Sequence, residues 1–325
     1  MRVALSRALP CRPVALGESP SSFASGVASL GEAVGNSDPG TTMLVFDRVA
    51  TLKEHLRKLE RQGLRVGFVP TMGALHDGHL SLIAQARARA EVVVASIFVN
   101  PKQFGPNEDL ARYPRDLEGD QRKLAAAGCD VLFAPNVEEM YPPGFQTTVE
   151  VTQASQGLCG AARPDHFKGV TTVVMRLFSI VHPHVAVFGE KDYQQLTVLR
   201  TMARDLGLDV EVIGAPLVRD PDGLAMSSRN VYLSPEDRRR ALALSQGLRR
   251  AEARFVAGER SGAVLVATAQ AELSQVGLTP EYLELRDAET LEPRTEARGP
   301  VVLLVACRVG TTRLLDNVIM GRGPS

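Results

Sequence analysis

The sequence has no excess of charge of either sign. Its 37 lysines and arginines balance its 37 aspartates and glutamates, which leaves a formal net charge of zero. A chain without a net positive field does not attract nucleic acid or an anionic membrane surface by charge. We therefore expect small-molecule partners, with neither nucleic acid nor a membrane among them.

Cysteine is also scarce, and no run of apolar residues is long. The cysteines show no C-x-x-C spacing, which argues against a zinc site and against a disulfide framework. They are Cys11, Cys129, Cys159 and Cys307. No stretch reaches the roughly 18 apolar residues of a membrane-spanning helix. These absences favour a soluble protein of the reducing cytoplasm.

Residues 1–42 differ in composition from the rest of the chain. They are rich in Ser, Gly, Ala and Pro, and their apolar periodicity is weak. This composition predicts a disordered extension or a start codon placed too early, with Met43 as the working first residue. A faint likeness to a transit peptide lacks the amphipathic helix of such peptides. The remainder is long enough for two domains, which we expect at residues 43–218 and 219–325.

Strand and helix patterns alternate from Met43 onward, which predicts an α/β fold. The run at residues 92–99 is nearly all apolar and β-branched, as in a central parallel strand covered on both faces. Further strands are expected at residues 44–46, 66–69, 131–134, 185–188 and 210–213, with residues 216–218 as the exit of the last one. Helices are expected at 49–59, 117–127, 170–181 and 196–206. Helices at 235–255 and 261–276 and strands at 282–286 and 301–309 predict a smaller α+β unit.

A turn with two histidines follows the strand at residues 66–69. Residues 70–79 read PTMGALHDGH and lead into a helical pattern. Such a strand-turn-helix unit directs backbone N–H groups and a helix dipole at a sheet edge, where phosphate binds well. His76 and His79 flank Gly78, so both rings can face one side of the first helical turn. We interpret the turn as a site for attack on the α-phosphate of ATP; a plain helix surface and a metal site are the alternatives.

Polar residues also follow two later strands. Asn100 and Gln103 come after the strand at residues 92–99, where they could contact a substrate or simply form a turn. Lys191 comes after the strand at residues 185–188, where its ammonium could reach phosphate oxygens or lie on the surface.

Two further clusters carry charge or hydroxyl groups. Ser227, Ser228 and Arg229 stand together on a loop, which suits a polyphosphate better than a helix cap because Ser234 opens the next helix. Asp120 lies near the start of a predicted helix, where it could hold Mg²⁺ or complement the helix dipole.

The motifs described above form four segments that follow one another along the chain: residues 70–79, 100–104, 189–195 and 226–230. Together they resemble the pantothenate synthetase family (pantoate–β-alanine ligases, AMP-forming) of the His-x-Gly-His nucleotidylyltransferase superfamily, from about Met43 to Asn317. The resemblance implies a Rossmann-like doubly wound parallel sheet of the nucleotidylyltransferase type, with a smaller α+β C-terminal domain that closes over the site. It also implies a homodimer formed through the first domain.

The family's reaction has two steps. Pantoate attacks the α-phosphate of ATP to give pantoyl adenylate and pyrophosphate, and β-alanine then displaces AMP. The resemblance therefore implies a C–N bond-forming ligase with ATP as co-substrate and Mg²⁺ as its companion ion. Residues 157–169, around Arg163 and His166, and the loop at Met226 are expected to close and to keep water from the adenylate.

The resemblance also implies roles for individual residues. His76, His79 and Lys191 would be catalytic, with His79 as the proton donor. Gln103 and Gln195 match the pantoate-binding glutamines, Gln103 also facing β-alanine, and Asp120 matches an acidic residue near the metal. The ATP site would comprise Met72, Gly73, His76, Gly78, His79, Gly189, Glu190, Lys191, Asp192, Val218, Met226, Ser227, Ser228 and Arg229.

Two residues depart from the family pattern. Lys102 stands where an apolar residue such as Met is usual, and it could point to solvent or add a cation near a carboxylate-bearing substrate. Cys159 stands where Glu is expected. Neither change touches the predicted phosphate-binding set, so we expect effects on affinity rather than on activity.

Three other functions compete with this interpretation. Another nucleotidylyltransferase would lack the pair of glutamines. An aminoacyl-tRNA synthetase would need a basic tRNA-binding domain, which a chain of zero net charge does not supply. A catalytically silent nucleotide-binding protein would have lost one of the predicted phosphate-binding residues, and all of them are present.

Overall fold

A seven-stranded sheet forms the centre of the structure. The computed structural model describes residues 33–34, 43–106 and 108–322. Six strands pair in parallel, and their spatial order is β2 (Met43–Phe46), β5 (Val131–Phe133), β4 (Val92–Ile97), β3 (Val66–Thr71), β6 (Val185–Gly189) and β7 (Glu211–Ala215). A two-residue strand, β1 (Ala33–Val34), adds an antiparallel edge beside β2. The predicted parallel α/β sheet is confirmed, and β1 was not predicted.

The order of the strands reverses at the centre of this sheet. From β3 the chain proceeds to β4 and β5 on one side, and it later continues from β6 to β7 on the other. In doubly wound sheets, ligands bind in the crevice beyond the carboxyl ends of the two strands at this reversal. Here those ends are Thr71 of β3 and Gly189 of β6.

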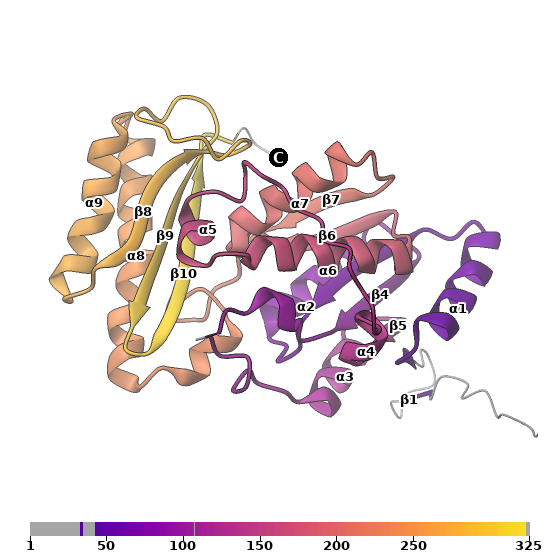
Figure 1. The fold of residues 1–325 in the computed structure, drawn as a ribbon. Coiled ribbons are helices and arrows are strands. Elements are labelled where there is room, and N and C mark those ends of the chain that lie inside the picture. Colours follow the sequence, from indigo (N-terminus) through magenta and orange to yellow (C-terminus); the bar gives the residue numbers. More distant parts are fainter. Residues whose placement is uncertain (1–32, 35–42, 107, 323–325) are drawn as a thin grey trace, which may run out of the picture. The chain divides into compact units, whose positions relative to one another are not determined.

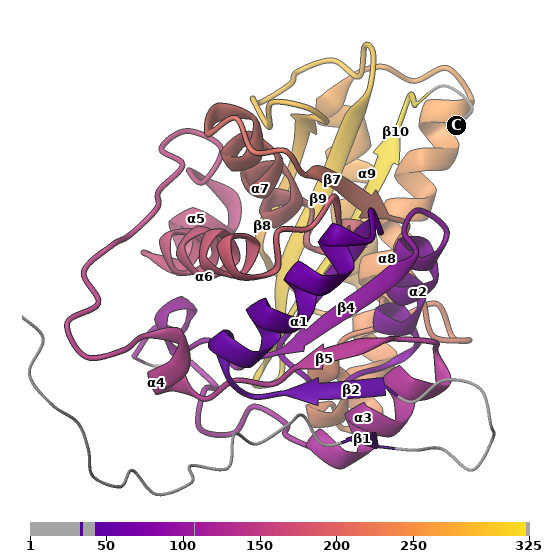
Figure 2. The ribbon, with the colours of Figure 1, turned by 90° about the vertical axis from the view of Figure 1, so that its right-hand side faces the viewer.

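Helices cover both faces of the sheet. One face packs on α1 (Val49–Arg61), α6 (His166–Val181) and α7 (Tyr193–Asp205), and the other packs on α2 (Asp77–Arg87) and α3 (Leu117–Ala126). Successive strand residues point to opposite faces, so Phe68 faces the first layer and Val69 the second. This two-sided burial explains why the strands read as nearly continuous apolar runs. Figure 2 shows α1 in front of the strands and α2 behind them.

The C-terminal part forms a second layered unit, seen on the left of Figure 1. Helices α8 (Pro235–Val256) and α9 (Gly262–Gln275) pack on an antiparallel sheet of β8 (Pro280–Asp287), β9 (Val301–Val309) and β10 (Thr312–Met320). Leu244, Leu265 and Val305 belong to its separate apolar core. The predicted α+β unit is confirmed, but β10 had not been predicted.

Several predicted boundaries need correction. The strand predicted at residues 210–213 is β7, which runs from Glu211 to Ala215 and ends before the predicted exit at 216–218. Helix α6 begins at His166 rather than at Val170, and the predicted flap contains a short helix, α5 (Leu158–Ala162). Another short helix, α4 (Val137–Met140), follows β5.

The proposed domain limits remain predictions. Apart from Ala33–Val34, residues 1–42 lie outside the described residues, and so does the prediction made for them. The described residues group as one compact unit, so the boundary between residues 218 and 219 stays a prediction. Among the described helices, none is long and apolar enough to cross a membrane.

Candidate active site

A cavity opens where the strand order reverses. Most of the predicted site residues line it: Met72, His76, Gly78, His79, Asn100, Gln103, Gly189, Lys191, Asp192, Gln195, Val218, Met226, Ser227, Ser228 and Arg229. Residues 70–79, 100–104, 189–195 and 226–229 therefore converge, although they are far apart in the sequence. The other three predicted residues, Gly73, Glu190 and Asp120, do not line the cavity.

The turn after β3 has an unusual backbone. Gly73 and Ala74 both have positive φ, at 81° and 52°, and such a conformation is unfavourable for alanine. Asp120 of α3 stabilises the turn, because its carboxylate accepts the backbone N–H of Ala74 at 2.7 Å and that of Leu75 at 2.8 Å. Lys123, one turn further along α3, donates to the carbonyl of Leu75 at 2.7 Å.

These contacts add to the interpretation of Asp120. Its side chain is 1% exposed, and both oxygens already accept backbone N–H groups. The two N–H contacts give this carboxylate a structural role in the turn, and one lone pair remains on each oxygen. The predicted role of Asp120 near a metal stays a prediction. Within the described residues, no group of three or more His, Cys, Asp or Glu side chains could hold a metal.

The turn presents two neutral imidazoles. The rings of His76 and His79 lie 4.1 Å apart between centroids. Burial, together with nearby Lys191, lowers the pKa of His76 to about 4, and burial, together with His76, lowers the pKa of His79 to about 3. The His79 Nδ1 accepts the backbone N–H of His76 at 3.4 Å, which leaves the ring proton on Nε2. His79 can therefore donate a hydrogen bond, but it carries no charge at neutral pH.

Lys191 and Asp192 stand in a short 3₁₀ turn, η2 (Glu190–Asp192), directly after β6. The ammonium of Lys191 lies 3.5 Å from the carboxylate of Asp192. Asn317 of β10 holds this turn, because its amide donates to the carbonyls of Glu190 and Lys191 at 2.9 Å each. The carboxylate of Glu190 instead pairs with Arg322 at 2.6 Å, which explains its absence from the cavity wall.

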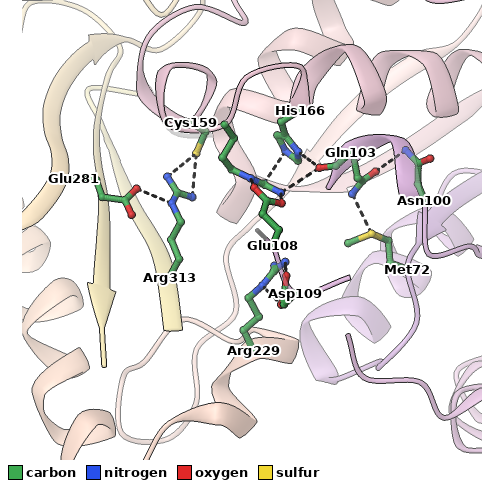
Figure 3. Close-up of polar contacts among 11 residues, drawn as sticks. Met72, Asn100, Gln103, Glu108, Asp109, Cys159, His166, Arg229, Glu281 and Arg313 are labelled. Carbon is green, nitrogen blue, oxygen red and sulfur yellow. Dashed lines mark hydrogen bonds and ion pairs between the residues drawn. The ribbon is translucent and has the colours of Figure 1, made fainter. Parts of the chain in front are cut away.

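The loop at residues 226–229 is tied to residues 108–115, a segment that the sequence did not mark as functional. Asp109 accepts two hydrogen bonds from the Arg229 guanidinium, each at 2.9 Å, and the pair is visible in Figure 3. The hydroxyl of Tyr113 lies 3.2 Å from that of Ser228, and Tyr113 also lines the cavity. These contacts join residues that are about 120 positions apart in the sequence.

Arg163 and His166 also line the cavity. Arg163 pairs with the carboxylate of Glu108 through Nε at 2.7 Å and donates from Nη1 to His166 Nε2 at 3.0 Å. A guanidinium can only donate, so the His166 proton lies on Nδ1, which donates to the carbonyl of Gln103 at 2.9 Å. Burial, and secondly Arg163, lowers the pKa of His166 to about 4.

The two departures from the family pattern lie outside the cavity wall. The Lys102 ammonium lies over the rings of Tyr141, 4.9 Å from its centroid, and Phe145, at 5.5 Å. Lys102 is exposed and lies over these rings at the surface, and it does not line the cavity. Cys159 is buried, with its sulfur 3.1 Å from the Tyr282 hydroxyl and 3.6 Å from the Arg313 guanidinium (Figure 3). The described cysteines, Cys129, Cys159 and Cys307, are all free thiols.

Comparisons with known proteins point to one family. The family model of pantoate-beta-alanine ligase matches residues 44–319. A pantothenate synthetase of Myxococcus xanthus is 57% identical over 280 residues, which cover 85% of this chain and 96% of that protein. A pantothenate synthetase of Geobacter sulfurreducens is 52% identical over 280 residues, covering 86% of this chain and 99% of that protein.

Solved structures give the same result. The crystal structure of pantothenate synthetase from Thermus thermophilus has a TM-score of 0.81 and 49% identity, covering 84% of this chain and 98% of that one. Pantoate-beta-alanine ligase from Francisella tularensis, complexed with beta-gamma ATP and beta-alanine, has a TM-score of 0.71 and 34% identity. That alignment covers 87% of this chain and 100% of the Francisella chain.

Proposed function

The chain belongs to the pantoate–β-alanine ligase family, and from this membership we infer that it joins pantoate to β-alanine in an ATP-dependent reaction. In the first step, a carboxylate oxygen of pantoate attacks the α-phosphorus of ATP, and the bond to the β-phosphate oxygen breaks. In the second step, the amine of β-alanine attacks the acyl carbon, the bond to AMP breaks and a proton leaves the nitrogen. The products are pantothenate, AMP and pyrophosphate.

One observation supports this function most directly. The histidine turn, the lysine after β6 and the Ser-Ser-Arg loop line a single cavity at the point where the strand order reverses. Pantoate and ATP are both anions, so a site that joins them must first neutralise charge. Lys191 and Arg229 supply permanent positive charge, and neutral His79 supplies an N–H donor. Such preorganised donors act most strongly on the charge that develops on the leaving pyrophosphate.

We propose the following division of roles within the cavity. Residues 72–79, 189–192 and 226–229, with Val218, bind ATP, and His76 and His79 contact the phosphates. Gln103 and Gln195 bind pantoate, whose branched apolar carbons fit the wall formed by Val173, Val174 and Leu177 of α6. Holding the carboxylate in line with the α-phosphorus contributes several kcal/mol to catalysis.

Magnesium has no assigned ligand in this proposal. Mg²⁺ keeps several waters and binds mainly through the phosphates of its nucleotide, so it can enter with ATP without a dedicated protein cage. Each oxygen of Asp120 accepts one backbone N–H of the turn and keeps one lone pair, so its role near the metal stays a prediction.

The decisive experiment is isotope exchange between pyrophosphate and ATP in the absence of β-alanine. We expect exchange only when pantoate is present, because the adenylate must form before it can reverse. The variant His79→Ala should exchange about 100-fold more slowly or worse, as when a transition-state donor is removed. An exchange rate that does not depend on pantoate, or unaltered turnover in His79→Ala, would contradict the proposed function.

Two further features stay proposals. The family resemblance supports a homodimer, and sedimentation that finds only monomer at micromolar concentration would contradict it. The scarcity of cysteines and the absence of C-x-x-C pairs support a location in the reducing cytoplasm.

A further inference from the structure

The side chain of Asn100 is fully committed to other protein groups. Its Oδ1 accepts from the Tyr141 hydroxyl at 2.8 Å and from the backbone N–H of Lys102 at 3.2 Å. Its Nδ2 donates to the carbonyl of Gly169 at 3.1 Å and to Gln103 Oε1 at 3.0 Å. An amide offers two acceptor sites and two donors, and all four are used. With 1% exposure, Asn100 has no polar capacity left for a substrate.

These contacts also fix which way round the amide lies. A backbone N–H can only donate and a backbone carbonyl can only accept, so the contacts with Lys102 and Gly169 exclude the flipped orientation of Asn100. Gln103 Oε1 must then face Asn100. The Gln103 Nε2 group faces the other way, where it lies 3.0 Å from the sulfur of Met72, as Figure 3 shows. Gln103 therefore turns a donor, not an acceptor, toward the cavity.

Tyr141 belongs to this chain of contacts but not to the cavity wall. It follows α4, and its ring lies 6.0 Å from that of Phe98 and 5.1 Å from that of Phe145 between centroids. Its hydroxyl makes the shorter of the two contacts to Asn100 Oδ1, so its removal leaves this oxygen with one long partner.

We propose that Tyr141 is a positioning residue for pantoate recognition: through Asn100, its hydroxyl holds Gln103 with the Nε2 donor facing the substrate. This proposal rests on the proposed function. Pantoate offers a carboxylate and hydroxyl oxygens, all of which can accept a hydrogen bond. A Gln103 amide turned the other way would present an oxygen to that carboxylate and would repel it.

The test is steady-state kinetics of Tyr141→Phe with pantoate and ATP varied separately. We expect the KM for pantoate to rise about fivefold, the usual effect of one lost hydrogen bond, while the KM for ATP changes less than about twofold. Tyr193→Phe is the matched control, because it removes another buried tyrosine hydroxyl, which donates to the carbonyl of Ala288 at 2.7 Å outside the cavity wall. Its two KM values should stay at the wild-type values.

A second variant tests the orientation of the amide independently. Gln103→Glu keeps an acceptor for Asn100 but replaces the outward donor by a carboxylate oxygen, so the KM for pantoate should rise at least about 100-fold. An unchanged KM for pantoate in either variant, or an equal rise of both KM values in Tyr141→Phe, would overturn the proposal. If the wild-type enzyme shows no pantoate-dependent pyrophosphate exchange, the proposed function itself fails instead.

Discussion

The turn at residues 72–79 and the loop at residues 226–229 face the same cavity but are held in different ways. The turn lies between β3 and α2, and two residues of α3 hold its backbone. The buried Asp120 carboxylate accepts the N–H groups of Ala74 and Leu75, and the exposed Lys123 donates to the Leu75 carbonyl. The loop is half-buried and depends on charged and polar contacts with residues 108–115, chiefly the ion pair of Arg229 and Asp109.

This difference separates two tasks within one reaction. The turn carries neutral imidazoles in a fixed backbone, which suits groups that must be aligned before charge develops. The loop carries a permanent cation whose partner is a carboxylate, so it can respond to an incoming polyanion. The comparison predicts that damage to the turn impairs the chemistry, whereas damage to the loop impairs the binding of ATP.

The largest effect is expected for Asp120→Ala. The change leaves the backbone N–H groups of Ala74 and Leu75 without an acceptor and should lower the free energy of unfolding by about 3 kcal/mol. The distorted turn should slow pyrophosphate exchange by about 100-fold. Urea unfolding and the exchange assay measure the two effects.

Asp116→Ala is the matched control on the same helix. The Asp116 carboxylate caps α3 by accepting the N–H of Gly119 at 2.9 Å, and its loss should cost about 1 kcal/mol with nearly full activity retained. If both variants lose equal activity, the turn has no special dependence on Asp120. If Asp120→Ala chiefly raises the Mg²⁺ concentration needed for half-maximal rate, the predicted role of Asp120 near a metal is confirmed.

A smaller effect is expected for Asp109→Asn. The substitution weakens the paired hydrogen bonds that hold Arg229, so the KM for ATP should rise about tenfold while kcat changes little. Asp222→Asn is the control, because Asp222 pairs with Arg238 at 2.8 Å at an exposed site where such pairs contribute little. A fall in the KM for ATP in Asp109→Asn would mean that Asp109 competes with ATP for Arg229.

The same contrast explains how much the sequence could reveal. The turn after β3 was predictable because its signals are local: an apolar run, glycines, and two histidines at helical spacing. The pairing of Arg229 with Asp109 was not predictable, because the two residues are 120 positions apart and no local sequence pattern links them. The convergence of both segments on one cavity was expected only because four segments together resembled a known family.

Asp120 and β10 show where local rules fail. A carboxylate near a helix start suggests a dipole or metal role, yet Asp120 binds backbone N–H groups about 45 residues upstream. In β10, the buried Asp316 and Asn317 interrupt the apolar pattern of a strand. They are tolerated because Asp316 pairs with Arg219 and Asn317 donates to carbonyls of the turn after β6. Sequence periodicity does not reveal such partners.

The smallest expected effect is the part of the pH dependence of stability that comes from His79 in the turn. The pKa of His79 is lowered by burial to about 3, against an ordinary value near 6.5. Between these values the unfolded chain binds a proton that the folded chain does not, so stability falls as the pH falls. From pH 6.5 to pH 5, His79 alone should reduce the free energy of unfolding by about 1.5 kcal/mol.

Urea unfolding at both pH values, compared between wild type and His79→Gln, measures this difference. From pH 6.5 to pH 5, the free energy of unfolding of His79→Gln should fall by about 1.5 kcal/mol less than that of wild type. The free energy of unfolding of Asp109→Asn should fall by as much as that of wild type. Burial raises the pKa of Asp109, but the pairing with Arg229 outweighs it and keeps this pKa below its ordinary value. The Asp109 carboxylate therefore stays ionised in both the folded and the unfolded chain above pH 5. Equal losses in wild type, His79→Gln and Asp109→Asn would show that the His79 ring is not the neutral, buried group that distinguishes the turn from the loop.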